Sequence, residues 1–355
     1  MSAVPADAVP AVAAAEPRWK AALEPIGRWV VAILGALVIF GAFMWAKGVN
    51  PLDAYRSMWE SLKTTNSISG VLIKGSPLIL AALAVTVPAR AGLVNVGGEG
   101  QLIMGGVFAT WVSIHFGTSL GGTGTLVAMG VAAALGGALW AGLAGALRLW
   151  VGINEAVTTL LLNYVALNFM LFLIYDPWKD VKAGGQPTSA PIPVNQRLPL
   201  LGTSTVHAGI VVALVATGVV WWVLRSTRWG FQLQVVGGNR EAARRAGMSV
   251  GLLLLSAMLV GGALAGLGGF VQLAGTEFKL RPGFLATYGY IGFLASWLAR
   301  HKPIQVAVAA LALSAISVSG DSLQIDSQLP AATVNILMAL VLLAVFGFTG
   351  RKAST

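Results

Sequence analysis

Residues 225–250 read RSTRWGFQLQVVGGNREAARRAGMSV and separate two strongly apolar runs of the chain. Concentrated positive charge distinguishes this 225–250 segment from the other polar interruptions. Asn239 is a good N-cap, the residues after it are good helix formers, and Gly247 suits the left-handed position that ends a helix. We therefore expect a helix of about two turns, which is marginal on its own. It either docks on a partner or belongs to a solvated loop with helical character.

The composition places this helix in a membrane protein. Hydrophobic residues make up 56% of the 355 residues, charged residues only 10%, and the mean hydropathy is +0.78. An ordinary soluble domain carries about 25% charged residues. The sequence therefore predicts an all-α integral membrane protein. The absence of cysteine excludes disulfides and thiol chemistry. In a membrane protein the net charge of +10 bears on orientation in the membrane and need not indicate nucleic-acid binding.

Ten apolar segments predict ten transmembrane helices. The first is an uncleaved helix at 29–46, which follows an Ala- and Pro-rich tail at 1–27 that we expect to be disordered. Small residues recur at close-packing spacing, as in 262–266 and 141–145, and favour close contact between helices. The other nine segments are 76–90, 101–117, 125–148, 156–175, 206–224, 250–273, 284–299, 303–320 and 331–349.

The positions of Lys and Arg set the expected orientation. With the amino terminus inside, the short connections at Arg90, Arg148 and 300–302, and the 225–250 segment, all lie on the cytoplasmic side, as the positive-inside rule requires. Both termini are then cytoplasmic, including a tail at 351–355. The transmembrane domain at 28–350 divides into halves at 28–205 and 206–350. Five spans in each half give the second half the inverted topology known from inverted-repeat transporters.

A Gly-rich polar break interrupts each half at the corresponding place. The first break, residues 92–101, reads GLVNVGGEGQ, and the second break, residues 275–283, reads GTEFKLRPG. Irregular backbone at membrane depth needs protein or a water-filled cavity around it. On the outer side, the Pro-rich connection at 176–205 and an amphipathic helix at 51–59 either receive a partner or serve as plain connectors.

The few polar residues within the spans outline a candidate pathway for an uncharged polar solute. Polar and aromatic groups suit a base and a ribose, and would suit a sugar nearly as well. For any single residue, hydrogen bonding between helices is the simpler explanation, because unpaired polar groups are costly in a membrane. The candidate pathway residues are Asn95, Glu99, Gln101, Asn154, Thr158, Asn163, Gln272, Tyr288 and Trp297.

The sequence offers no energy source or catalytic group of its own. It lacks the phosphate-binding pattern GxxxxGK[ST], its three histidines are isolated, and no catalytic or metal-binding cluster stands out, so we expect no cofactor. Only Glu99 and Glu155 qualify as groups of a buried ion pathway. This argues against a self-powered secondary transporter or channel, which stays an alternative, as does a membrane-embedded enzyme.

Three motifs together resemble the permease subunits of ABC importers. The run EAARRAG at 241–247 looks like the EAA-xxx-G coupling segment of these permeases. The runs RAGLVNVGGEGQ at 90–101 and GINEAVTTLLLNY at 152–164 are similar to those of nucleoside permeases. These belong to the branch that moves ribose-type sugars, branched-chain amino acids and nucleosides. The resemblance covers residues 28–349.

The resemblance implies a ten-span permease subunit of an ATP-driven nucleoside importer in the bacterial inner (plasma) membrane. Simple sugars and branched-chain amino acids are the alternative substrates. The implied partners are a cytoplasmic ABC ATPase, a second related permease rather than a second copy of this chain, and an extracytoplasmic substrate-binding lipoprotein of the basic-membrane-protein type. ATP hydrolysis would take place on the separate ATPase chain. The docking residues for the ATPase, in a coupling helix at 237–248, would be Gly238, Asn239, Arg240, Glu241, Ala242, Ala243, Arg244 and Gly247.

Overall fold

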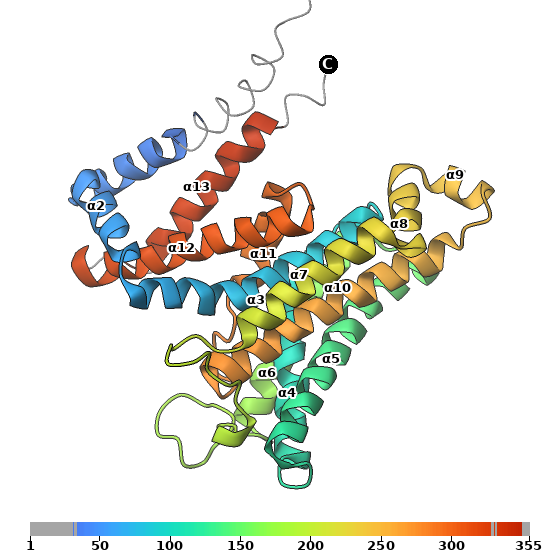
Figure 1. Cartoon of the computed structure of the whole chain (residues 1–355), viewed down its shortest axis with the longest axis horizontal. Coiled ribbons are helices and arrows are strands. Elements are labelled where there is room, and N and C mark those ends of the chain that lie inside the picture. Colours follow the sequence, from blue (N-terminus) through green and yellow to red (C-terminus); the bar gives the residue numbers. More distant parts are fainter. Residues whose placement is uncertain (1–30, 32–33, 328–329, 331, 350–355) are drawn as a thin grey trace, which may run out of the picture. The chain divides into compact units, whose positions relative to one another are not determined.

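The computed structural model describes residue 31, residues 34–327, Pro330 and residues 332–349. In that part of the chain every regular element is a helix (Figure 1). The β-type pairing there consists of two isolated bridges. The tails expected at 1–27 and 351–355 lie outside the described residues. The chain divides into two compact units, residues 52–335 and the two chain ends beyond that range. In the smaller unit, Phe40 and Phe43 stack with their ring centroids 6.3 Å apart.

The helices follow one another with short connections, apart from the long one between α6 and α7. A helix at Leu34–Ala46 comes first. The later elements are α2 (Pro51–Leu62), α3 (Thr65–Arg90), α4 (Gly98–Phe116), α5 (Gly121–Val151), α6 (Glu155–Tyr175), the 3-10 turn η1 (Val194–Gln196), α7 (Gly209–Ser226), α8 (Arg228–Gly238), α9 (Arg240–Arg245), α10 (Val250–Gln272), the π-helical turn η2 (Leu273–Glu277), α11 (Tyr288–Leu298), α12 (Pro303–Ser327) and α13 (Ala332–Thr349).

Among the described residues, six helices are long and apolar enough to cross a membrane, judged by length and composition. They are α3, α5, α6, α7, α12, and α10 together with η2, and the count rises to seven if Leu34–Ala46 and α2 are taken as one span. The chain is therefore a multi-pass membrane protein. The helix predicted over 284–299 is shorter in the structure, because α11 has only 11 residues. Its length of about 16 Å is roughly half the hydrocarbon thickness of a bilayer.

Two boundaries differ most from the sequence prediction. The apolar pattern predicts a helix over 76–90, but α3 begins at Thr65, where the hydroxyl of Thr64 accepts a hydrogen bond from the backbone N–H of Ser67. The 225–250 segment contains two helices where the pattern predicts one. The hydroxyl of Thr227 caps the additional helix, α8, by accepting from the backbone N–H of Gly230 at 3.1 Å.

Helix α10 packs against α3, α4 and α5 in the larger unit, and glycines allow the close approach (Figure 1). A Cβ atom on Gly262 would lie 2.2 Å from the carbonyl oxygen of Gly137, and one on Gly266 would lie 2.0 Å from that of Ala133. Facing α4, a Cβ on Gly269 would lie 2.0 Å from the carbonyl oxygen of Leu102. No side chain fits at these crossings, as the spacing of small residues in 262–266 predicts.

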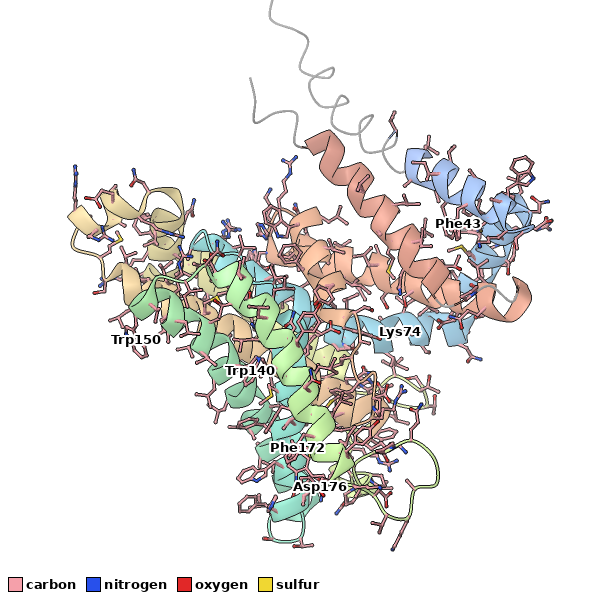
Figure 2. The ribbon with its side chains drawn as sticks, turned by 180° about the vertical axis from the view of Figure 1, so that it is seen from behind. Phe43, Lys74, Trp140, Trp150, Phe172 and Asp176 are labelled. Carbon is pink, nitrogen blue, oxygen red and sulfur yellow. The ribbon has the colours of Figure 1, made fainter. Side chains whose placement is uncertain are left out.

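Polar contacts also join neighbouring helices away from these crossings. The indole Nε1 of Trp140 in α5 donates to the carbonyl oxygen of Leu162 in α6 at 3.2 Å (Figure 2). Lys74 of α3 pairs with Asp321 of α12 at 2.7 Å (Figure 2). Since both groups of this pair are partly exposed, it contributes little to stability.

Candidate functional site

Helix α9 is short but is capped at both ends. The side-chain oxygen of Asn239 accepts from the backbone N–H of Ala242 at 3.0 Å. At the other end, Gly247 has φ +78°, and the N–H groups of Gly247 and Met248 donate to the carbonyl oxygens of Arg244 and Ala243. This is the Schellman arrangement, in which glycine provides the left-handed residue. The predicted helix between Asn239 and Gly247 is confirmed.

The charged side chains of α9 lie on its surface. Glu241 pairs with Arg244 at 2.9 Å and with Arg245 at 3.2 Å, and all three side chains are more than half exposed. Exposed pairs of this kind contribute little to stability. Gly238, just before α9, has open space where a Cβ would stand, whereas Ala243 is buried. Helix α9 therefore exposes its charged side chains, whereas Ala243 is buried against the rest of the protein.

The 225–250 segment touches the first break directly. The Nη2 atom of Arg240 donates to the carbonyl oxygen of Gly92 at 2.9 Å. Gly237, in the last turn of α8, lies against the same stretch, so that a Cβ there would stand 2.3 Å from the carbonyl oxygen of Arg90. Gly92 itself has φ +70°, a conformation that favours glycine. Helix α8 and the start of α9 are thus fitted to the turn that opens the first break.

Side chains of α5 and α6 hold the backbone of the first break. The N–H of Val94 donates to Oε1 of Glu155 at 3.1 Å, and the other carboxylate oxygen of Glu155 pairs with Arg148 of α5. The N–H of Val96 donates to the hydroxyl of Thr159 at 3.2 Å. Glu155 is a buried charge, so its pairing with Arg148 makes this position tolerable.

Three buried amides complete the support of the first break. Asn95 and Gln101 exchange two hydrogen bonds, at 3.1 and 2.8 Å, and Asn95 also bonds to the backbone of Ala84 and Gly97. Asn163 of α6 accepts from the N–H of Gly100 at 2.8 Å and donates to the carbonyl oxygen of Val96 at 3.0 Å. These predicted pathway residues therefore bond to one another and to nearby backbone, and Asn163 also donates to the hydroxyl of Tyr290 at 3.4 Å.

Glu99 faces a different helix. Its two carboxylate oxygens accept from the N–H groups of Thr287, at 2.6 Å, and of Gly289, at 3.0 Å, at the start of α11. The backbones meet here as well, because a Cβ on Gly289 would lie 2.0 Å from the backbone nitrogen of Glu99. The amino-terminal ends of α4 and α11 are therefore in direct contact, although 190 residues separate them.

The other predicted pathway residues lie apart from the buried amides. Asn154 caps α6, and the hydroxyl of Thr158 bonds to the backbone of α6 itself. Gln272 is the last residue of α10, Tyr288 is the first of α11, and Trp297 lies in the last turn of α11. The structure thus gathers Asn95, Glu99, Gln101 and Asn163 around the first break and places Tyr288 between the two residues that donate to Glu99. The remaining four, Asn154, Thr158, Gln272 and Trp297, lie at the ends of α6, α10 and α11.

The second break is held by the long connection between α6 and α7. Arg197 of that connection lies over the ring of Phe278, with the guanidinium carbon 4.0 Å from the ring centroid. Phe278 has φ +59°, which is strained for a residue other than glycine. Three backbone groups of the break make hydrogen bonds to the connection: Leu280 O accepts from Ser189 N at 3.0 Å, Leu280 N donates to Ser189 Oγ at 2.9 Å, and Phe278 O accepts from Ile192 N at 2.7 Å. Just before the break, Ala274 O accepts from Leu198 N at 2.9 Å.

His207 is a contact of the second break that the sequence does not reveal. Its ring lies against Gly275, where a Cβ would stand 2.7 Å away, and its Nε2 is 3.4 Å from the hydroxyl of Thr276. Burial lowers the pKa of His207, because the imidazolium form is poorly solvated there. No neighbouring residue in the sequence marks this histidine, whereas Glu155 and Thr159 at the first break stand within the GINEAVTTLLLNY motif.

Comparison with known proteins places these features in a family. Residues 67–346 match the family described as branched-chain amino acid transport system / permease component. The glucose ABC transporter permease protein TsgB13 of Haloferax volcanii is 37% identical over 341 residues, which cover 92% of this chain and 87% of the relative. The guanosine ABC transporter permease protein NupP of Bacillus subtilis is 31% identical over 89% of this chain and 91% of the relative. The nucleoside ABC transporter permease protein NupB of Lactococcus lactis is 29% identical over 88% of both chains.

Proposed function

This chain belongs to the branched-chain amino acid transport system / permease component family, and from that premise we propose that it forms the translocation pathway of a nucleoside importer. It is a permease subunit of an ABC transporter and is not itself an enzyme. The family implies an ATPase partner and a substrate-binding protein. The energy for transport therefore comes from a separate chain, and the permease must receive it through a contact surface.

The ATPase docks on α9 and on Gly238 and Asn239 just before it. The contact between the 225–250 segment and the first break carries this proposal. Arg240 bonds to Gly92, and Gly237 leaves no space between α8 and Arg90, so a displacement of α9 reaches the first break without an intervening flexible loop. Arg244 and Glu241 lie on the accessible face, where charged groups of a partner would exchange for the present intrahelical pairs.

The proposed topology has ten membrane-embedded helices, five in each inverted half, at 28–205 and 206–350, with both termini in the cytoplasm. Leu34–Ala46, α4, α11 and α13 join the six long apolar helices in this count. The contact between α4 and α11 supports the inversion. Helix α4 follows the first break, α11 follows the second break, and the starts of these two helices are in contact. Paired helix starts at the interface of two halves are typical of transporters built from inverted repeats.

Nucleosides are the proposed substrates because two kinds of observation favour them. The first break and the start of α6 carry the two motifs that resemble nucleoside permeases, and NupP and NupB have nucleosides in their names. A simple sugar is the second candidate, favoured by the higher identity to the glucose permease TsgB13. We propose Tyr288, Gln272 and Trp297 as the residues closest to the pathway. The polar groups of Asn95, Gln101, Asn163 and Glu99 are already bonded to one another or to the backbone.

The proposed assembly contains a second, related permease, which we favour over a second copy of this chain, and a substrate-binding lipoprotein on the outer side, in a bacterial plasma membrane. The connection between α6 and α7 is the proposed landing site of the binding protein. It lies at the opposite end of the helices from α8 and α9 (Figure 1) and is bonded to the second break.

A reconstituted importer tests the proposal. The complex of this chain with its ATPase, second permease and binding protein is placed in proteoliposomes. Two quantities are then measured: the uptake of labelled guanosine, uridine and glucose, and the rate of ATP hydrolysis. We expect nucleoside-stimulated hydrolysis that Gly247→Val abolishes, because φ +78° is unfavourable for valine and the cap of α9 is lost. Ser119→Ala, at an exposed turn, is the control. Unchanged hydrolysis and uptake in Gly247→Val would refute docking at α9, and uptake of glucose alone would refute the substrate.

A further inference from the structure

We infer that Glu99 is a positioning residue: it holds the start of α11 against α4 in the resting permease, and ATP-driven transport requires its release. We call Glu99 and the N–H groups of Thr287 and Gly289 the α4–α11 clasp. The inference deepens the proposed function, because it needs an ATPase to drive the release, but it does not depend on which solute is carried.

The clasp is the side-chain link between two helix starts from different halves. One carboxylate accepts two backbone N–H groups, at 2.6 and 3.0 Å. The first N–H groups of a helix have no carbonyl partner within that helix, and Glu99 provides the partner for these two. Hydrogen bonds to a charged acceptor are stronger than neutral ones. The same carboxylate also lies where the start of a helix favours negative charge. Glu99 therefore satisfies α11 as an N-cap does, but from another helix.

The backbone on both sides of α11 is strained. Leu285 and Thr287 before it have φ +54° and +73°, and Arg300 and His301 after it have φ +51° and +56°. Residues other than glycine hold such angles only where surrounding contacts impose them, and they cluster at switch regions. With 11 residues between these points, α11 is a short rigid body with a strained joint at each end. A body of this kind changes position when one of its end contacts is released.

The two ends of α11 are held by different chemistry. At the far end, the hydroxyl of Ser296 lies 2.8 Å from that of Thr86 in α3 and 2.9 Å from Nδ1 of His301. In the middle, a Cβ on Gly292 would lie 2.7 Å from Ala81 of α3. These contacts hold α11 on α3, which is one continuous helix. The clasp instead holds α11 on the first break, which is irregular and is also bonded to Arg240.

The clasp is therefore the end of α11 that a movement of α9 can reach. Arg240 bonds to Gly92, and Glu99 is in the first turn of the helix that the same break leads into. We place the pivot of α11 at Ser296 and the moving end at Thr287. A substrate ligand would need an accessible polar group, whereas both oxygens of Glu99 already accept hydrogen bonds.

Amide hydrogen exchange of the assembled importer tests the inference on the two N–H groups themselves. Exchange of the peptide 284–291 is measured without nucleotide and after trapping with ATP and vanadate. In the wild type we expect slow exchange without nucleotide and faster exchange in the trapped state. Equal protection in the two states would overturn the inference, and this measurement needs no substitution and no identified solute.

Glu99→Gln sharpens the test, because it keeps the size of the side chain and removes the charge. We expect exchange of the same peptide to rise at least about tenfold without nucleotide, as the loss of hydrogen bonds to a charged acceptor predicts. We also expect ATP hydrolysis to continue while uptake falls. Glu60→Gln, the same change at an exposed pair with Lys63 on α2, is the matched control and should leave exchange of 284–291 unchanged.

The outcomes separate the clasp from its alternatives. A substrate-contacting Glu99 predicts a changed half-saturation concentration for uptake with unchanged exchange in Glu99→Gln, and this result overturns the clasp. Glu99→Asp keeps the charge on a shorter side chain and should restore part of the protection. If the wild type transports no nucleoside but shows nucleotide-dependent exchange at 284–291, the proposed substrate fails and the clasp stands.

Discussion

The two breaks of this permease are stabilised by different groups. The first break takes its hydrogen bonds from side chains of buried residues, among them Glu155, Thr159 and Asn163 of α6. At the second break, backbone N–H groups of the connection between α6 and α7 donate to Phe278 and Leu280, beside contacts from the side chains of Ser189 and His207. A side-chain scaffold fixes one geometry through several specific groups, whereas a backbone scaffold lets the connection change sequence while keeping the same bonds. The first break should therefore be the more sensitive to substitution.

The difference in how the two breaks are stabilised also matches the proposed partner site that lies beside each break. Helix α9, the main part of the proposed ATPase contact, touches the first break through Arg240, and α8 before it touches the same stretch through Gly237. The second break adjoins the proposed landing site of the binding protein and contains a strained Phe278. A rigid first break transmits a displacement with little loss, and a strained second break is suited to rearrange when a binding protein arrives.

Removing the carboxylate of Glu155 should have the largest effect. Glu155→Ala leaves Arg148 without its buried partner and the N–H of Val94 without its acceptor. Breaking a buried ion pair in this way costs about 3–5 kcal/mol. Thermal unfolding of the detergent-solubilised permease should show a clear fall in Tm. Asn168→Ala, at an exposed position of the same helix, is the control. A Tm change no larger than the control's would mean that α6 does not stabilise the first break.

A methyl group at Gly237 should separate coupling from assembly. Gly237→Ala forces apart α8 and the turn at Arg90, because the new Cβ would stand 2.3 Å from that carbonyl oxygen. Overpacking of this kind costs about 1–3 kcal/mol. We expect the complex to assemble and hydrolyse ATP while uptake falls several-fold. Gly218→Ala, which adds a methyl group in open space on α7, should keep wild-type uptake. Uptake equal in both variants would contradict transmission through this contact.

At the second break, two adjacent residues allow a matched comparison. Ser189→Ala removes the acceptor of the buried N–H of Leu280 and should cost about 1–3 kcal/mol. The buried hydroxyl of Thr188 has no hydrogen-bond partner within the described residues, so Thr188→Val should be neutral or stabilising. Denaturant midpoints of the two purified variants check this. Equal destabilisation would show that the loop packs on the second break through apolar contact alone.

The same contrast explains what the sequence predicts and what it does not. The helix caps Asn239 and Gly247 are visible because each needs a particular residue type, and both are confirmed. The residues of the first break are visible as a polar motif, but the sequence does not say that Glu99 bonds to α11, since its partners are backbone groups distant in the chain. Helix α8 is missed because its cap, Thr227, precedes Arg228 and Trp229 rather than an apolar repeat. The backbone contacts of the second break leave no residue signature, because any residue but proline supplies the same N–H group.

Acid should weaken the second break selectively, with the smallest effect of these tests. Burial lowers the pKa of His207 below its ordinary value of about 6.5. The unfolded chain therefore takes up a proton at a higher pH than the folded one. The stability that neutral His207 provides is complete above pH 6.5 and is lost as the pH falls below that value. Amide exchange of residues 274–280 should increase from pH 7.5 to pH 5.5, after correction for intrinsic rates, more than exchange of residues 92–97. His207→Gln, which keeps a polar group beside Gly275, should remove the difference. A persisting difference in that variant would assign the acid effect to another group of the connection.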